Sequence, residues 1–232
     1  MTGKRRPVAQ VGPVFLIVGG AAGLIGGATH GDLPEDSGAA ALQFVADHPA
    51  YALVHIVSIL GAVLWSIGLA GRYVDRATPT GQWPAAAAGH AALAGAAVMA
   101  VQFSIDGIGM TALAALWSEP GASRETFEAI AEIAPAALVG TALTWVVILY
   151  GLAPILAGSS LVLTARPVLG WTAVALGAFS VVGGLTLALR VNLLPDWLVF
   201  AGATIGVNLW IICLGAAQLR GAPARTSQAI AQ

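Results

Sequence analysis

Residues 50–71 have the sequence AYALVHIVSILGAVLWSIGLAG and contain no Asp, Glu, Lys or Arg. A helix of this length can cross the hydrocarbon core of a bilayer, which takes about 20 apolar residues. Five more runs have the same character, so the sequence predicts an all-α fold, a polytopic transmembrane helical bundle. The six predicted spans are 11–29, 50–71, 84–104, 133–156, 167–189 and 197–219.

The composition agrees with this class of protein. Charged residues make up 9% of the chain and the mean hydropathy is +0.85, whereas about 25% of an ordinary soluble domain is charged. Six spans and their connections use nearly all of the 232 residues. We therefore expect one membrane domain at 11–219, between a basic cytoplasmic tail at 1–10 and a cytoplasmic tail at 220–232. The lipid bilayer is its expected surrounding, with no nucleic-acid partner.

Charges in the connections are sorted by sign. If the chain has six spans, one side collects acidic residues in the loops around 32–47 and 119–132, and the other side collects basic residues. Positively charged loops favour the cytoplasm, so this asymmetry predicts that both termini are cytoplasmic. High Ala and Gly content and a preference for Arg over Lys favour a bacterial plasma membrane. The basic residues on the predicted inner side are Lys4, Arg5, Arg6, Arg72, Arg76, Arg166, Arg220 and Arg225.

Three features of the outer connections predict local structure. Ser37 can cap a short helix whose apolar side, with Ala41, Phe44 and Val45, lies on the membrane. The third span continues apolar well beyond one crossing, and the sequence DGIG at 106–109 predicts a break. Residues 110–117 would then form an interfacial or re-entrant turn. Residues 123–132 are predicted to form an acidic helix that leads into the fourth span.

Glycines in the first and last spans recur at every fourth position. This spacing lets helix backbones approach closely in a membrane. We expect it to serve packing inside the bundle, with a homo-oligomer face or a membrane-complex partner as the alternative. The glycines are Gly19, Gly23 and Gly27 in the first span and Gly202 and Gly206 in the last.

Few polar side chains lie within the spans, and such residues indicate function by default. His55 lies about two turns below the outer end of its span and Asp106 at the outer end of the next. Because a histidine beside a carboxylate suits proton relay or acid–base catalysis, these two are the catalytic candidates. The alternative is a purely structural pair, or a salt bridge between Asp106 and Arg190. Most ionisable candidates fall in the outer half, and the binding candidates are Gln102, Arg190, Thr204 and Asn208.

No metal or cofactor is predicted from the sequence. His30, Asp32, His48 and His55 lie toward the outer side, but His48 and His55 are about 10 Å apart along one helix. Haem would need two histidines that face each other at one depth, whereas His55 is outer and His90 inner.

The carboxy-terminal half resembles a family of small bacterial integral membrane proteins of unknown function. The resemblance rests on LYGLAPILAGSSL at 149–161, PVLGW at 167–171 and LGAFSVVGG at 176–184, where a glycine-punctuated span is followed by a Pro-x-x-Gly turn. LPDW at 194–197 and LW at 209–210 are compatible with it. The resemblance implies a membrane protein and brings no activity or functional residue.

Two functions remain open at this point. The favoured hypothesis is a small permease or channel-like unit, or an accessory membrane subunit, with a polar site in the outer half of the bundle. The alternative is a membrane-embedded enzyme that acts on a lipid or isoprenoid, with Asp106 as general acid or base and His55 assisting.

Overall fold

The computed structural model describes residues 8–31, 33–34, 36–74, 79–164, 166–189, 191 and 195–220, and within these ranges it leaves out the side chains of 8–10, 72–74, 79, 135–139, 141–143, 196 and 197. The described chain is helical and contains no strand. Arg190, Asp32 and most of both predicted tails lie outside these residues. The elements, in chain order, are α1 (Val8–Thr29), α2 (Gly38–Asp47), α3 (Tyr51–Val74), α4 (Pro79–Phe103), η1 (Ser104–Gly109), α5 (Met110–Trp117), α6 (Arg124–Trp145), η2 (Val146–Leu152), α7 (Ala153–Leu163), α8 (Pro167–Ala188) and α9 (Asp196–Arg220).

Six stretches of helix are long and apolar enough to cross a membrane, as the hydropathy predicts. They are Val11–Thr29, Tyr51–Gly71, Thr80–Trp117, Val146–Leu163, Pro167–Ala188 and Leu198–Arg220. The fourth of these helices extends beyond its predicted bounds at both ends. It begins at Arg124, within the predicted acidic helix, and continues to Leu163 rather than ending at 156.

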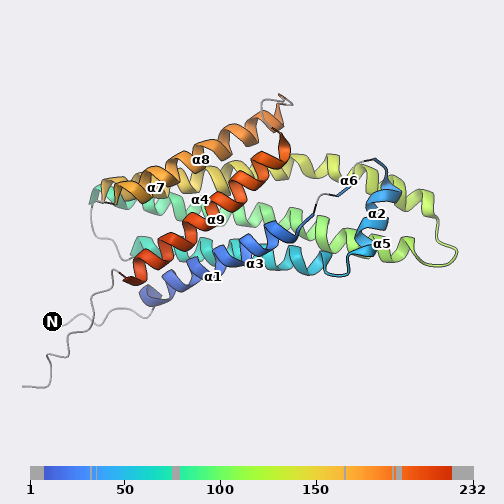
Figure 1. The fold of residues 1–232 in the computed structure, drawn as a ribbon, viewed down its shortest axis with the longest axis horizontal. Helices are drawn as coiled ribbons and strands as arrows, with labels where there is room; N and C mark the ends of the chain where they lie inside the picture. The colour runs from blue at the N-terminus through green and yellow to red at the C-terminus, as the bar shows by residue number, and fades with distance from the viewer. Residues whose placement is uncertain are drawn as a thin grey trace, which may run out of the picture.

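The helices form a closed ring in chain order. Each spanning helix packs against the next, and α9 returns to pack against α1. Figure 1 shows that α1 begins and α9 ends at the same end of the bundle. The centre of the ring is filled by large buried side chains, among them Trp65, Trp145, Leu149 and Tyr150.

Two of the long helices contain a π-helical segment. The segment η1 joins α4 to α5, and η2 joins α6 to α7, without interrupting the helix in either case. The predicted break at 106–109 is therefore a change of helical pitch. The interfacial or re-entrant turn expected at 110–117 is wrong, because these residues continue the helix as α5. A π turn keeps the backbone hydrogen-bonded with one more residue per turn, so glycines at 107 and 109 do not end the helix.

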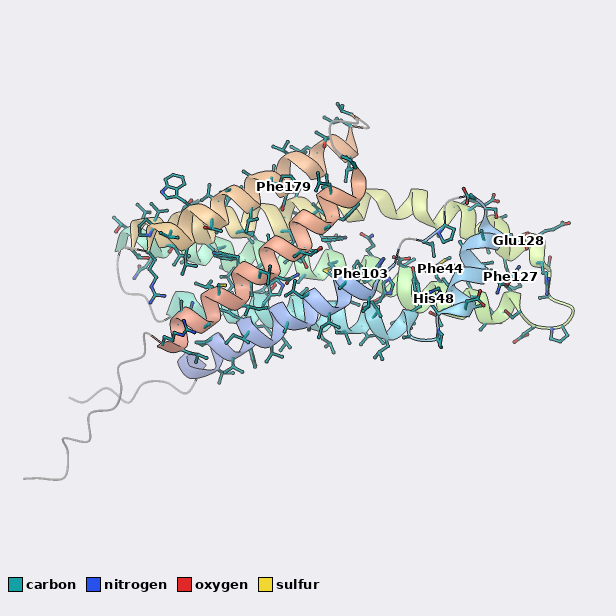
Figure 2. All side chains as sticks on the ribbon, viewed as in Figure 1. Phe44, His48, Phe103, Phe127, Glu128 and Phe179 are labelled. Atoms are coloured by element: carbon teal, nitrogen blue, oxygen red, sulfur yellow. The ribbon has the colours of Figure 1, made fainter. Side chains whose placement is uncertain are left out.

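The end of the bundle away from α1's first residue carries a projecting part. There, α2, α5 and the first turns of α6 extend beyond α1, α8 and α9 (Figure 1). They bury a second apolar cluster that includes Leu42, Val45, Met110 and Trp117. Figure 2 shows Phe44, Phe127 and Glu128 in this part of the molecule.

The predicted capping of α2 by Ser37 is confirmed. The prediction that its apolar side lies on the membrane is not. The Ala40 N–H donates to Ser37 Oγ at 3.1 Å, which satisfies one of the free amides at the helix start. The apolar side of α2, however, packs against α5 and α6 rather than on a membrane surface. The helix is thus part of a small folded layer at the end of the bundle.

Glycines allow the closest helix contacts within the ring. A Cβ at Gly19 would lie 2.7 Å from the Gly61 carbonyl oxygen of α3, and one at Gly23 would lie 2.5 Å from Asn208 Oδ1 of α9. Added Cβ atoms at Gly202 and Gly206 would meet Phe179 and Leu176 of α8. The predicted use of these glycines in packing inside the bundle is confirmed.

Candidate functional site

His55 and Asp106, separated by about fifty residues in sequence, are in contact. His55 Nε2 lies 3.2 Å from Asp106 Oδ2. His55 lies one turn into α3, and Asp106 lies in η1, the π segment that follows α4. The two catalytic candidates that the sequence identifies therefore belong to one site.

The π segment brings the two helices together at this point. Gly107 is buried against His55, and a Cβ at this position would overlap the Cβ and Cγ atoms of the histidine. The absence of a side chain at 107 thus lets η1 approach the imidazole closely enough for the neighbouring carboxylate to reach it. Gly109, two residues later, faces no such restriction, since its added Cβ would meet only Ser104 O at 3.7 Å.

His30 completes the cluster from the end of a third helix. It directly follows α1, and its Nε2 lies 3.6 Å from Asp106 Oδ2. The His30 and His55 rings are stacked at an angle, with centroids 4.5 Å apart. One ligand atom from each of His30, His55 and Asp106 lies within 4.8 Å of the others. We call these three residues, with Tyr51, the His–Asp site.

Tyr51 and Phe103 border the site. The Tyr51 hydroxyl donates to Asp106 Oδ1 at 3.1 Å, so both carboxylate oxygens face polar partners. Phe103 lies 5.0 Å from the His55 ring and 5.5 Å from the His30 ring, between centroids. Figure 2 shows Phe103 where the projecting part meets the bundle. Aromatic walls of this kind limit water at the carboxylate and strengthen its interactions.

The hydrogen bonds fix the tautomer of both imidazoles. His55 Nδ1 lies 2.8 Å from the Tyr51 carbonyl oxygen, and His30 Nδ1 lies 2.7 Å from the Gly31 carbonyl oxygen. A carbonyl oxygen only accepts, so each Nδ1 carries the proton and donates it. Each Nε2 then points toward the carboxylate with its lone pair, unless a proton or a metal ion occupies it.

The His–Asp site is partly exposed at one end of the bundle, and we call its exposed edge, formed by Asp106 and His30, the rim. The side chain of His55 is fully buried, whereas those of Asp106 and His30 are 15% and 29% exposed. Next to the site, Trp145 contacts Phe103 and Tyr150 edge to face, with centroid distances of 5.8 and 5.5 Å. The polar cluster therefore sits on a filled apolar core.

Gln102 and Asp106, four residues apart, contact different helices. Its side-chain oxygen accepts a hydrogen bond of 2.7 Å from Trp145 Nε1, so it joins α4 to α6. Asp106 faces α3 instead, because the π turn between them changes the register that four-residue spacing would give. Gln102 thus serves a buried contact next to the site. The candidate salt-bridge partner Arg190 lies outside the described residues.

Thr204 and Asn208 lie in a different place, within α9. Asn208 Nδ2 donates to the Thr204 carbonyl at 2.7 Å and approaches the Tyr150 hydroxyl at 3.4 Å. Thr204 Oγ1 donates to the Phe200 carbonyl at 2.6 Å. Asn208 is fully buried, and its Oδ1 finds no hydrogen-bond partner in the described part of the chain. Trp65, whose ring lies 6.1 Å from that of Tyr150, also has an unpartnered Nε1 there. We call Trp65, Tyr150 and Asn208 the mid-bundle cluster.

Sequence reasoning missed His30 and Tyr51 as members of the site. The sequence groups His30 with Asp32, His48 and His55 as a conceivable metal site and not with Asp106. In the structure, His48 instead stacks on Phe44, and its Nδ1 lies 2.6 Å from the Phe44 carbonyl oxygen. Position along the predicted spans could have grouped these residues, since His30, Tyr51 and Asp106 all fall at the same end of their helices. Tyr51 also precedes His55 by four residues, a spacing that shares a helix face.

Comparison of the whole chain with models of protein families, with curated proteins and with solved structures finds no match.

Proposed function

We propose that this chain is a multi-pass protein of a bacterial plasma membrane that binds a cation in the His–Asp site, as an accessory membrane subunit. The observation that carries the proposal is the convergence of His30 Nε2, His55 Nε2 and Asp106 Oδ2 from three helices. One carboxylate and two imidazole lone pairs directed at one small volume attract positive charge. Ionisable groups at such a depth in a membrane protein indicate function by default.

The packing below the site favours binding over conduction. Phe103, Trp145 and Tyr150 are buried and in ring contact beneath it, and Leu149 and Trp65 fill the neighbouring space. A cation that enters at the rim meets closely packed rings, and the polar groups of the mid-bundle cluster beyond them are neutral and fully buried. The accessory role is therefore better supported than the permease or channel-like role.

The proposed topology places both termini in the cytoplasm and the His–Asp site at the outer end. Support comes from the acidic residues at the site's end of the bundle, which include Asp47, Glu125 and Glu132. Labelling tests it in a Cys213→Ser background. An impermeant maleimide is expected to label Ser123→Cys in intact cells and Thr80→Cys only after lysis. The opposite pattern would reverse the orientation.

Cation binding is tested by thermal unfolding in lipid nanodiscs at fixed pH. Sodium, calcium, zinc and tetramethylammonium ions are added in turn. At about 100 times its dissociation constant, a cation bound to the folded state contributes about 2.7 kcal/mol. We expect at least one cation to raise the Tm of the wild type and to leave Asp106→Asn unchanged. Asp47→Asn, which removes an exposed carboxylate from the same end, should respond like the wild type. If no cation distinguishes the wild type from Asp106→Asn, the proposal fails.

A second candidate function, acid–base catalysis on a lipid or isoprenoid, is favoured by one observation. The Tyr51 hydroxyl donates to Asp106 Oδ1, and His55 Nε2, when it carries a proton, donates to Asp106 Oδ2, which makes a hydrogen-bonded chain at the end of two spanning helices. Such a chain can hold and deliver a proton. Turnover of prenylated or acylated lipids by purified protein, lost in Asp106→Asn, would support it. Equal turnover by that variant would exclude a catalytic role for the carboxylate.

A further inference from the structure

The ligand atoms of the His–Asp site are directed at one small volume. Both Nδ1 atoms donate to backbone carbonyls, so it is Nε2 of each imidazole that faces Asp106 Oδ2. One ligand atom from each of His30, His55 and Asp106 lies within 4.8 Å of the others.

A metal ion satisfies all three atoms at once. It accepts both imidazole lone pairs while the rings stay neutral, and it balances the carboxylate charge. Bonds of about 2.0–2.1 Å to a tetrahedral zinc ion place its ligand atoms about 3.3 Å apart. The distances from Asp106 Oδ2 to His55 Nε2 and His30 Nε2 are 3.2 and 3.6 Å. The geometry points to a divalent transition-metal site formed by His30, His55 and Asp106, which deepens the proposed function and rests on it.

The surroundings of the three ligands fit a built metal site. Metal-bound histidines commonly donate their other ring N–H to a carbonyl, which fixes the ring and raises its basicity. Both imidazoles here do so, to Tyr51 and Gly31. The carboxylate is held in turn by the Tyr51 hydroxyl on its second oxygen. Each of the three ligands therefore has an orienting partner.

The donor set selects the class of ion. Imidazole nitrogens suit zinc, iron, copper and nickel, whereas calcium and magnesium prefer sites made of oxygen atoms. Two histidines and one carboxylate also leave a coordination position open, as in catalytic zinc sites and in non-haem iron sites. The His30 side chain is 29% exposed, so the ion would be accessible from the rim. Water or a second ligand can occupy it.

Metal uptake by the full-length protein tests this inference directly. The protein in nanodiscs is stripped with a chelator, dialysed against Zn²⁺ or Co²⁺ and measured by elemental analysis and by the visible d–d bands of Co²⁺. We expect one ion per chain in the wild type. His30→Gln and Asp106→Asn should each bind more than about 100-fold more weakly, since the loss of a ligand exceeds the 10–100-fold loss seen for outer-shell partners. His48→Gln removes an imidazole from the same end that lies outside the cluster, so it should bind like the wild type.

The outcomes separate this inference from the proposed function. His55 is fully buried and its replacement can prevent folding, so the test uses the partly exposed His30 and confirms each variant by size exclusion and circular dichroism. Wild-type protein that binds neither Zn²⁺ nor Co²⁺, or a His30→Gln variant that binds them equally, overturns the inference. If calcium or tetramethylammonium still stabilises the wild type through Asp106, cation binding stands and only the transition metal is excluded.

Discussion

The His–Asp site and the mid-bundle cluster are two polar groups in one apolar bundle, and they are built differently. The first lies at the ends of its helices and contains the ionisable side chains His30, His55 and Asp106, of which two are partly exposed. The second is fully enclosed, and its polar atoms belong to neutral groups. The cost of a buried charge grows with depth, whereas a neutral amide is tolerated at mid-depth. Charge and exposure together therefore separate a site that can meet a ligand from one that fixes packing.

The largest effect is expected for Gly107→Ala, which should abolish metal binding at the His–Asp site and leave the mid-bundle cluster intact. The new Cβ overlaps His55 Cβ and Cγ, so the imidazole must move away from the carboxylate. We expect metal binding to fall by more than about 100-fold, with a destabilisation of about 1–3 kcal/mol from overpacking. Gly109→Ala is the matched control in the same π segment, because its Cβ has room. Dialysis and denaturant titration measure the two effects, and equal behaviour of both variants would contradict the assigned contact.

Gly23→Ala should disturb only the mid-bundle cluster. Its Cβ would lie 2.5 Å from Asn208 Oδ1, so we expect the free energy of unfolding to fall by about 1–3 kcal/mol. Metal binding should not change. The control is Gly12→Ala in the same helix, where the nearest atom lies at 3.5 Å and Ala raises helix propensity. Loss of metal from Gly23→Ala would mean that the two clusters are coupled.

Tyr51→Phe should weaken metal binding at the His–Asp site without leaving a cavity. The variant removes the hydroxyl that holds Asp106 Oδ1 and keeps the ring in its apolar surroundings. A tenfold loss of metal affinity, about 1.4 kcal/mol, is expected for an orienting partner of this kind. Competition with a zinc chelator measures it. Unchanged affinity would show that the hydroxyl is not needed to orient the carboxylate.

Asn208→Leu is expected to have the smallest effect. Both side chains have four heavy atoms branched at Cγ, and hydrogen bonds within membrane bundles contribute about 0.6 kcal/mol on average. Removal of the unpartnered Oδ1 offsets part of that loss. A change in unfolding free energy within about 0.6 kcal/mol, with full metal binding, would sharpen the contrast with Asp106→Asn. A large loss of metal binding would instead make Asn208 part of the functional site.

Hydropathy predicts most of the fold because bilayer thickness sets the minimum length of each apolar run. The six runs, the start of α8 at Pro167 and the capping of α2 by Ser37 follow from local rules. The course of residues 104–117 does not follow from such rules. A π turn has no composition of its own, and glycine near a helix end equally favours a break. What keeps α5 helical is its packing against α2 and α6, which is a tertiary effect.

Part of the His–Asp site was also predictable from the sequence. His55 and Asp106 could be identified individually, because an ionisable residue in a span is unusual. Their contact, at 3.2 Å, depends on which helices adjoin and on the rotation of η1. His30 escaped prediction because spacing rules compare residues on one helix, whereas this site draws on three. Depth along each span is the property that its residues share.

The π turn of Ser104–Gly109 also makes the site sensitive to chain length. Each residue turns an α-helix by about 100° and advances it by about 1.5 Å. Deletion of a single codon in this segment would restore regular α-helix and rotate every side chain beyond it relative to α3. The three ligands would remain in the sequence, yet they would no longer meet. A single insertion or deletion before Asp106 in this segment is therefore enough to make or to abolish the site, with every ligand residue still encoded.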